Sequence, residues 1–145
     1  MYIVFYLDEN PKGTAQEKGV AYQGGRIHHF EKKNVRTMRQ IYTAKIKQAL
    51  LEDHIKVEPI EGPVYMSVSF HFATKTKKKW GTYKDTKPDL DNSVKLLQDV
   101  LSDLGFFAVG DQQVASLHLT KWWSDVPHIA ISIQKLEEDN DVCGI

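Results

Sequence analysis

The segment from Val64 to Phe72 constrains the fold most strongly, because its side chains alternate strictly between two kinds. Val64, Met66, Val68, Phe70 and Phe72 are separated by tyrosine, serine or histidine. A period of two is typical of a β-strand that places one face on a hydrophobic core. The preceding Gly-Pro pair interrupts regular structure and marks the start of the segment. We therefore predict a strand here, with its apolar face against the core.

The remaining periodicities predict two helices and five further strands. The expected strands are 1–7, apolar on both faces, a hairpin formed by 20–22 and 27–30, and two later strands at 113–121 and 126–135. The expected helices, with apolar residues three or four apart, are 34–51 and 90–104, the second ending at Gly105. This order predicts an α+β fold with a mixed, mostly antiparallel sheet and two helices packed on it.

The chain has 145 residues, which suits one domain, with residues 137–145 as a flexible acidic tail. No apolar run reaches the roughly 20 residues of a membrane-spanning helix, and the N-terminus lacks the basic start of a secretory signal. The one cysteine, Cys143, has no partner for an internal disulfide, which favours the reducing cytoplasm. Disulfide scaffolds, zinc fingers and membrane proteins are thereby excluded.

Positive charge is concentrated in one part of a chain whose formal net charge is zero. Between Ala73 and Lys87 only Asp85 is acidic, and the basic residues there are Lys75, Lys77, Lys78, Lys79, Lys84 and Lys87. A local basic stretch attracts phosphate even when the whole molecule is neutral, so these lysines are candidate DNA-binding residues. The alternative is an ordinary solvated loop.

A group of carboxylates follows the lysines. Asp89 and Asp91 point to one side if their segment is extended, and Asp91 or Asn92 is suited to cap the helix. Positions 91, 95 and 99 follow one another on the polar helix face, so Lys95 lies near the acids. Asp111 becomes a third carboxylate if the chain doubles back after the helix. Three carboxylates suit Mg²⁺; the alternative is a helix cap with a surface ion-pair ladder.

These residues resemble a known family. The pattern Lys-Pro-Asp-Leu-Asp-Asn-x-x-Lys-x-x-x-Asp from Lys87 to Asp99, followed by glycine and Asp111-x-Gln113, resembles the RusA-type Holliday-junction resolvases, which prophages often encode. Most of the chain agrees with that family in the order of its elements. It departs from the family in having Gly110 where a further acid is usual, Ser93 where leucine is usual, and few arginines near the N-terminus.

The resemblance implies a dimeric, Mg²⁺-dependent endodeoxyribonuclease, with Mn²⁺ as a substitute, that resolves Holliday junctions by paired symmetric nicks in DNA recombination and repair. It makes Asp89, Asp91 and Asp111 the metal ligands, with Lys95 and Asp91 catalytic. The six lysines would then hold the DNA arms by their phosphates, and Trp80 and Tyr83 would stack on bases at the crossover. The alternative for Trp80 is that it only anchors the loop on the core.

A four-way junction is approximately two-fold symmetric, so symmetric nicking calls for a C₂ homodimer. Two alternatives remain open for this chain. One is a different metal-dependent nuclease for branched or flap DNA, and the other is a DNA-binding module without catalysis, whose carboxylates act only as caps.

Overall fold

The computed structural model describes residues 2–11, 18–23, 26–31 and 33–137. Its strands are β1 (Tyr2–Leu7), β2 (Lys18–Gln23), β3 (Arg26–Glu31), β4 (Val64–Ala73), β5 (Val114–Ser124) and β6 (His128–Lys135). Its helices are α1 (Lys33–Glu52) and α2 (Leu90–Asp103), with two 3-10 turns, η1 (Lys77–Lys79) and η2 (Asp111–Gln113). The predicted acidic tail lies outside the described residues apart from Glu137. No helix in the described ranges is long and apolar enough to cross a membrane.

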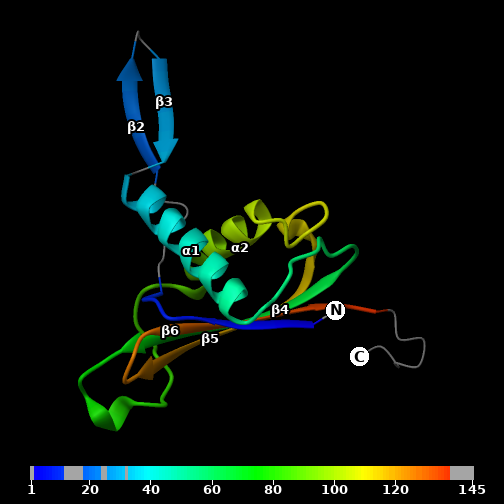
Figure 1. Cartoon of the computed structure of the whole chain (residues 1–145). Helices are drawn as coiled ribbons and strands as arrows, with labels where there is room; N and C mark the ends of the chain where they lie inside the picture. Colours follow the sequence, from blue (N-terminus) through cyan, green and yellow to red (C-terminus); the bar gives the residue numbers. More distant parts are fainter. Residues whose placement is uncertain (1, 12–17, 24–25, 32, 138–145) are drawn as a thin grey trace.

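The central sheet has four strands in the order β1-β6-β4-β5. β6 pairs antiparallel with both β1 and β4, whereas β4 and β5 are parallel. Strands β2 and β3 form a separate antiparallel hairpin, which projects away from the sheet beyond the start of α1 (Figure 1). The predicted α+β class and the mostly antiparallel, mixed sheet are therefore confirmed.

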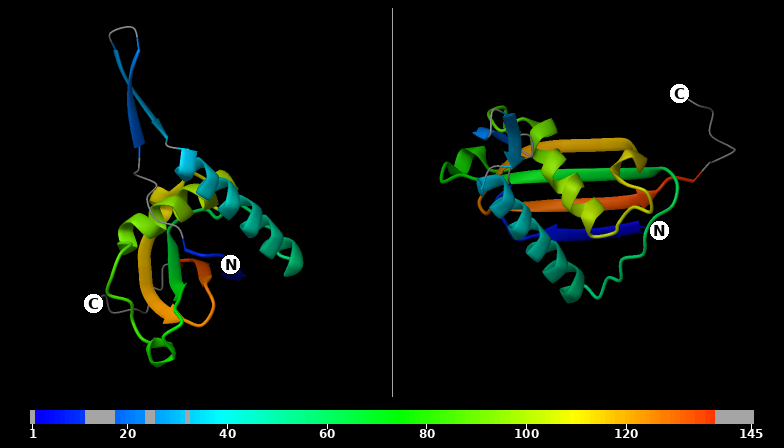
Figure 2. Two further views of the ribbon diagram at one scale, coloured as in Figure 1. Left: turned by 90° about the vertical axis from the view of Figure 1, so that its left-hand side faces the viewer. Right: turned by 90° about the horizontal axis from the view of Figure 1, so that it is seen from above.

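Both helices lie on the same face of the sheet, and the core lies between these two layers (Figures 1 and 2). The helices contribute their predicted apolar stripes, represented by Tyr42 and Ile46 on α1 and Leu97 and Leu101 on α2, all fully buried. The alternate residues of β4 that were predicted to face the core, Val64 to Phe70, are buried as well. Burying this continuous apolar surface is the main contribution to the stability of the domain.

No helix among the described residues covers the other face of the sheet. The prediction that both faces of the first strand are covered is wrong, because Tyr2 and Tyr6 are more than half exposed while Ile3, Phe5 and Leu7 are buried. Tyrosine carries a polar hydroxyl on an apolar ring, so its presence at alternate positions does not by itself distinguish a buried face from a wet one. The uncovered face is called the open sheet face below.

The connection from β4 through α2 to β5 separates two ends of the domain. Because β4 and β5 are parallel, the helix between them runs back along the sheet, as seen from above in Figure 2. The start of α2 therefore lies near the ends of both strands, and its end lies near their beginnings. Gly105, with a φ of +85°, ends the helix as predicted, and Phe107 then pairs with Ile60 just before β4.

Gln113 fastens the segment before β5 to the segment before β4. Its side-chain oxygen accepts hydrogen bonds from the backbone N–H groups of Val109 (2.6 Å) and Gly110 (3.2 Å). Its side-chain nitrogen donates to the carbonyl oxygens of Ile60 (2.7 Å) and Gly62 (2.9 Å). One amide group thus satisfies four backbone groups of two segments that are about fifty residues apart in sequence, and it fixes the position of η2.

Replacing Gln113 with alanine should lower the free energy of unfolding by about 1–3 kcal/mol, because the partly buried backbone groups lose their partners. Chemical denaturation of the variant measures this change. The exposed neighbour Gln112 provides a matched control, since Gln112→Ala should change stability by less than about 0.5 kcal/mol. Equal effects of the two substitutions would contradict the role given to Gln113.

Candidate active site

Asp89 occupies the residue just before α2. Its backbone is extended (φ −70°, ψ 146°) and its side chain makes no capping hydrogen bond, so neither Asp91 nor Asn92 is the cap residue that the sequence suggested. Instead, the Ser93 hydroxyl and backbone N–H both donate to the Asp89 carbonyl oxygen, at 2.9 and 3.0 Å. Ser93, which stands where the resembled family usually has leucine, therefore stabilises the start of α2. The Asp89 carboxylate stays exposed, with the Lys87 ammonium 3.2 Å away.

Asp91 and Lys95 lie on the exposed face of α2. Asp91 is in the first turn, where a negative charge is favoured by the helix dipole, and not in the extended segment assumed from the sequence. Lys95, one turn further on, is paired with Asp99 at 3.7 Å, and Asp99 is in turn 3.9 Å from Arg39 of α1. Of the predicted ladder of residues 91, 95 and 99, the structure shows the Lys95–Asp99 pair, which is linked to α1 through Arg39.

Two lysine ammonium groups hold the segment that precedes Asp89. Lys84 donates to the Thr86 hydroxyl and, at 2.6 Å, to the Lys87 carbonyl oxygen. Lys121 of β5 donates to the carbonyl oxygens of Thr86 (2.6 Å) and Pro88 (2.8 Å). Hydrogen bonds from charged donors are stronger than neutral ones. Together these bonds form a lysine clamp, Lys84 and Lys121 on residues 86–88, that fixes where α2 begins.

The structure contradicts the prediction that Lys84 binds DNA. Its side chain is only 8% exposed, and its ammonium group lies 4.4 Å from the Trp123 ring centroid and 5.2 Å from that of Phe72. Burial, and after it the positive charge of Lys121, lower the pKa of Lys84. Two of the three N–H donors of Lys84 are thus used within the loop, and the ammonium group is buried rather than presented to a phosphate at the surface. Sequence reasoning also missed Lys121, because nothing in its strand pattern distinguishes a clamping lysine from a solvated one.

The other five lysines of the basic loop (residues 74–88) are exposed, as a DNA contact requires. They are Lys75, Lys77, Lys78, Lys79 and Lys87. Trp80 is an anchor of this loop, since its indole N–H donates to the Thr74 carbonyl oxygen at 2.8 Å. The loop extends past the end of the sheet on the side where α2 begins (Figure 1).

Asp111 lies at the opposite end of α2 from Asp89. It begins η2, directly before β5, and Gln113 binds this turn to the residues before β4. Asp89 instead follows the segment that Lys121 clamps. Lys121 lies seven residues beyond Val114, the first residue of β5, which corresponds to about 23 Å at the usual rise per residue. The expectation that the chain doubles back to bring Asp111 beside Asp89 is therefore wrong for a single chain.

Within the described part of the chain, no three His, Cys, Asp or Glu side chains form a group that could hold a metal ion. One chain alone therefore does not fit the predicted three-carboxylate site, although Asp89 and Asp91 are close in sequence and both exposed. Lys95 shares their end of α2. The arrangement in one chain is two carboxylates and an ammonium group on a rigid helix start, beside a loop rich in lysine.

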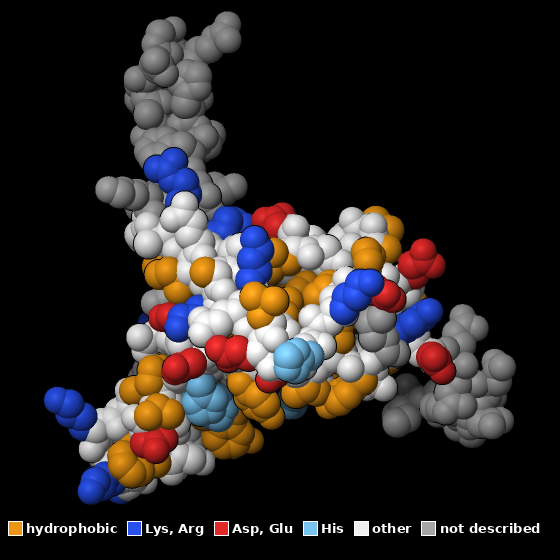
Figure 3. Space-filling view, viewed as in Figure 1, with side chains coloured by type: hydrophobic (Ala, Val, Ile, Leu, Met, Phe, Trp, Pro, Cys, Tyr) orange, Lys and Arg blue, Asp and Glu red, His pale blue; other side chains and the backbone are white. Residues whose placement is uncertain are grey.

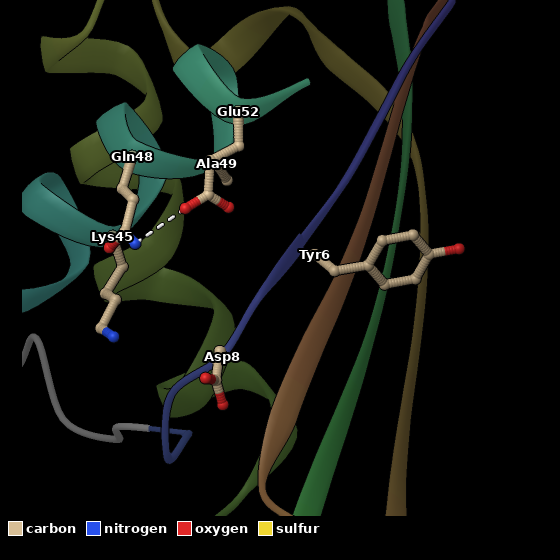
Figure 4. Close-up of a pocket in the computed structure, with 6 residues that line it drawn as sticks. All are labelled: Tyr6, Asp8, Lys45, Gln48, Ala49 and Glu52. Carbon is tan, nitrogen blue, oxygen red and sulfur yellow. Dashed lines mark hydrogen bonds between the residues drawn. The ribbon is translucent and has the colours of Figure 1, made fainter.

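The candidate site residues Asp89, Asp91 and Lys95 lie on an exposed surface. A hollow of about 160 Å³ lies between the end of β1 and α1, lined by acidic, basic and amide side chains, with Gln48 donating to Glu52 at 2.9 Å (Figure 4). None of the predicted site residues lines it. Figure 4 also shows that the Tyr6 ring points away from α1, toward the open sheet face. An exposed site of this kind suits a long polymeric substrate better than a small molecule.

Carboxylates and a lysine beside a cationic loop are groups suited to a protein that acts on phosphate esters. The sequence model of the family Endodeoxyribonuclease RusA matches residues 8–134. The crossover junction endodeoxyribonuclease rusA of Lactococcus phage r1t is 30% identical over 135 residues, which cover 91% of this chain and 95% of the phage protein. The uncharacterized protein YqaN of Bacillus subtilis strain 168 is 26% identical over 141 residues, covering 92% of this chain and 96% of YqaN.

The chain belongs to the RusA family of endodeoxyribonucleases, because the family model spans most of its length. The resemblance noted from Lys87 to Gln113 is thereby confirmed.

The lysine clamp predicts that Lys84→Met lowers the maximal rate of DNA cleavage by about 10- to 100-fold while leaving DNA affinity within about threefold, since small displacements of reacting groups are costly. Single-turnover rates measured against enzyme concentration separate the two quantities. Lys77→Met, at an exposed lysine, should do the reverse and weaken binding without changing the maximal rate. A Lys84 variant that loses affinity alone would show that Lys84 contacts DNA after all.

Proposed function

We propose that this chain is a structure-selective endodeoxyribonuclease that resolves Holliday junctions by paired symmetric nicks, in DNA recombination and repair. The observation that supports this most is the rigid presentation of Asp89, Asp91 and Lys95 at the start of α2, in a chain of the RusA family. The phage relative, which matches along nearly its whole length, is named as a crossover junction endodeoxyribonuclease.

In this proposal each side chain has a role set by its charge. Lys95 stabilises the negative charge that grows on the phosphate or on the leaving oxygen, because its ammonium lies on the same helix face as Asp91. The pairing of Lys95 with Asp99, and of Asp99 with Arg39, restricts where that ammonium can lie. Asp89 and Asp91 are the carboxylates that face the reacting phosphate.

We propose further that the active site is completed by a second chain. Asp111 is too far from Asp89 within one chain, whereas a two-fold axis can place Asp111 of the partner subunit opposite Asp89 and Asp91. The same axis gives two equivalent sites, as symmetric nicking of a junction requires. Mg²⁺, or Mn²⁺ in its place, would be held by these three carboxylates and would supply Lewis acidity and an activated water.

The exposed lysines of the basic loop are proposed to hold the duplex arms. Lys75, Lys77, Lys78, Lys79 and Lys87 extend past the end of the sheet near the start of α2, so phosphates bound there lie close to the carboxylates. Such contacts are independent of base sequence and weaken with salt. Lys84 is omitted from this surface because it belongs to the lysine clamp.

Replacing Asp91 with asparagine should preserve folding and junction binding and lower cleavage of a synthetic four-way junction by at least about 1000-fold, because the neutral amide no longer supplies a carboxylate. Gel analysis of end-labelled strands measures both the rate and the positions of the nicks. Asp53→Asn, at an exposed residue just after the end of α1, is the matched control and should cleave like the parent. Junction cleavage by the Asp91 variant at the parent rate would refute the assignment, and equal cleavage of flaps by the parent would favour a branched-DNA nuclease of broader selectivity.

The two-chain site predicts that two inactive variants restore each other. A hybrid dimer of one Asp91→Asn chain and one Asp111→Asn chain retains one site with all three carboxylates intact. Random exchange makes half of the dimers hybrids, so mixing should recover about a quarter of the parent's strand cleavage, as nicks on one strand only.

Each variant alone should be inactive, and the mixed sample should give single nicks and not paired ones. If the mixture stays as inactive as its components after confirmed exchange, the three carboxylates do not meet across two chains.

A further inference from the structure

Four aromatic rings form a continuous stack on the open sheet face. The rings belong, in order, to His128, His71, Trp122 and Tyr83. The centroids of His128 and His71 are 3.9 Å apart, those of His71 and Trp122 are 6.4 Å apart, and those of Trp122 and Tyr83 are 4.1 Å apart. Because the planes of neighbouring rings are inclined by 11° to 25°, the stack is close to parallel throughout.

Strand register explains why the rings meet. His71 of β4 is opposite His128 of β6 on one side and opposite Trp122 of β5 on the other. Tyr83 forms an isolated antiparallel bridge with Trp122, so the basic loop pairs with the free edge of β5 at this point. Residues that are directly opposite share a face of the sheet. His71 follows the buried Phe70, so this row faces away from the helices.

The backbone around Tyr83 is held firmly. Lys84 N–H donates to the Lys121 carbonyl oxygen at 3.0 Å, and Trp123 N–H donates to the Thr82 carbonyl oxygen at 2.9 Å. These bonds lie on either side of Tyr83 and are supported by the lysine clamp. The Tyr83 ring is thus the outermost member of the stack, placed beyond the edge strand by a segment with little freedom.

Tyr83 has one covered face and one free face. Its ring stacks on Trp122, yet the residue is 68% exposed, so the opposite face of the ring is in contact with solvent. Burial and the neighbouring His128 lower the pKa of His71, which favours its uncharged form near neutral pH. The stack therefore ends in the solvent-exposed face of an aromatic ring, a surface on which a nucleobase can stack.

The surroundings of this ring are cationic. Lys75, Lys77, Lys78 and Lys79 precede Tyr83 in the same loop, and Asp85 is the first acidic residue after Glu61. Figure 3 shows hydrophobic and histidine side chains along the lower edge of the molecule, which is the open sheet face, with basic side chains at the tip to the lower left. A free aromatic face beside exposed ammonium groups matches a base beside its phosphates.

We propose that the free face of Tyr83 stacks on a nucleobase exposed at the crossover of a four-way DNA junction, while the exposed lysines of the basic loop contact the flanking phosphates. This inference rests on the proposed function and specifies how a junction is told from a linear duplex. Bases at a crossover can lose a stacking neighbour, and Tyr83 supplies one. Tyr83 suits this role better than Trp80, which is less exposed (41% against 68%) and whose indole N–H is bonded within the loop.

A second copy of this chain is the alternative binding partner for the open sheet face. The lysines argue against it, since two identical basic loops brought together at the Tyr83 end would repel each other. DNA has the complementary charge. The oligomeric state of a Tyr83 variant distinguishes the two occupants directly.

The test compares Tyr83→Ala with Tyr2→Ala, at an equally exposed tyrosine on the same face but on the opposite edge strand, β1. Binding of a four-way junction and of a linear duplex of the same sequence is measured in chelator over a range of salt concentrations. Tyr83→Ala should weaken junction binding by about 5- to 100-fold and duplex binding by less than about twofold, because stacking is lost and phosphate contacts remain. The dependence of affinity on salt should not change, since no charge is removed.

Tyr83→Phe should bind like the parent, because the ring is retained, and Tyr2→Ala should bind like the parent as well. Equal weakening on junction and duplex, no weakening, or conversion of the Tyr83→Ala variant from dimer to monomer in sedimentation would each overturn the inference. Junction cleavage by the parent, measured with Mg²⁺ in parallel, reports on the proposed function alone. Its failure is therefore distinct from a failure of the stacking role.

Discussion

The parallel pairing of β4 and β5 is the constraint on which the candidate site depends. A helix that connects two parallel strands must run back along the sheet, so residues before and after it are placed at opposite ends. In this chain Asp89 precedes the helix and Asp111 follows it, and the helix between them has 14 residues, or about 21 Å. The fold of one chain thus places Asp89 and Asp111 far apart, although both belong to the same sequence motif. This separation explains why a dimer is central to the proposed function and not an incidental feature.

The lysine clamp and the Gln113 side chain hold the two ends of that connection. At the beginning of α2, Lys84 and Lys121 bind three consecutive residues through charged hydrogen bonds. At the other end, Gln113 joins two distant backbone segments. The lysine clamp and Gln113 both supply hydrogen-bond donors or acceptors to backbone groups that would otherwise lack partners. Each lies within a few residues of a carboxylate of the proposed active site. Precise placement of such groups contributes strongly to catalysis.

Much of the fold could be predicted from periodicity because burial enforces it. The predicted bounds of the strand at Val64–Phe72 and of both helices lie within a few residues of the observed ones, since each element buries a regular apolar face. The first strand was misjudged because tyrosine serves both buried and exposed faces. The position of Asp111 could not be read from spacing, because a short distance in sequence does not fix which end of a helix a loop returns to. Burial of Lys84 depends on Trp123, thirty-nine residues further along the chain, which no local pattern reveals.

The central claim is that carboxylates from two chains form one site. Anomalous diffraction from a crystal of the protein grown with Mn²⁺ would test it most directly, because Mn²⁺ replaces Mg²⁺ at oxygen sites and its position is seen independently of the protein. We expect the ion within coordination distance of Asp89 and Asp91 of one chain and of Asp111 of the partner subunit. An ion bound by Asp89 and Asp91 with both copies of Asp111 remote from it would contradict the account.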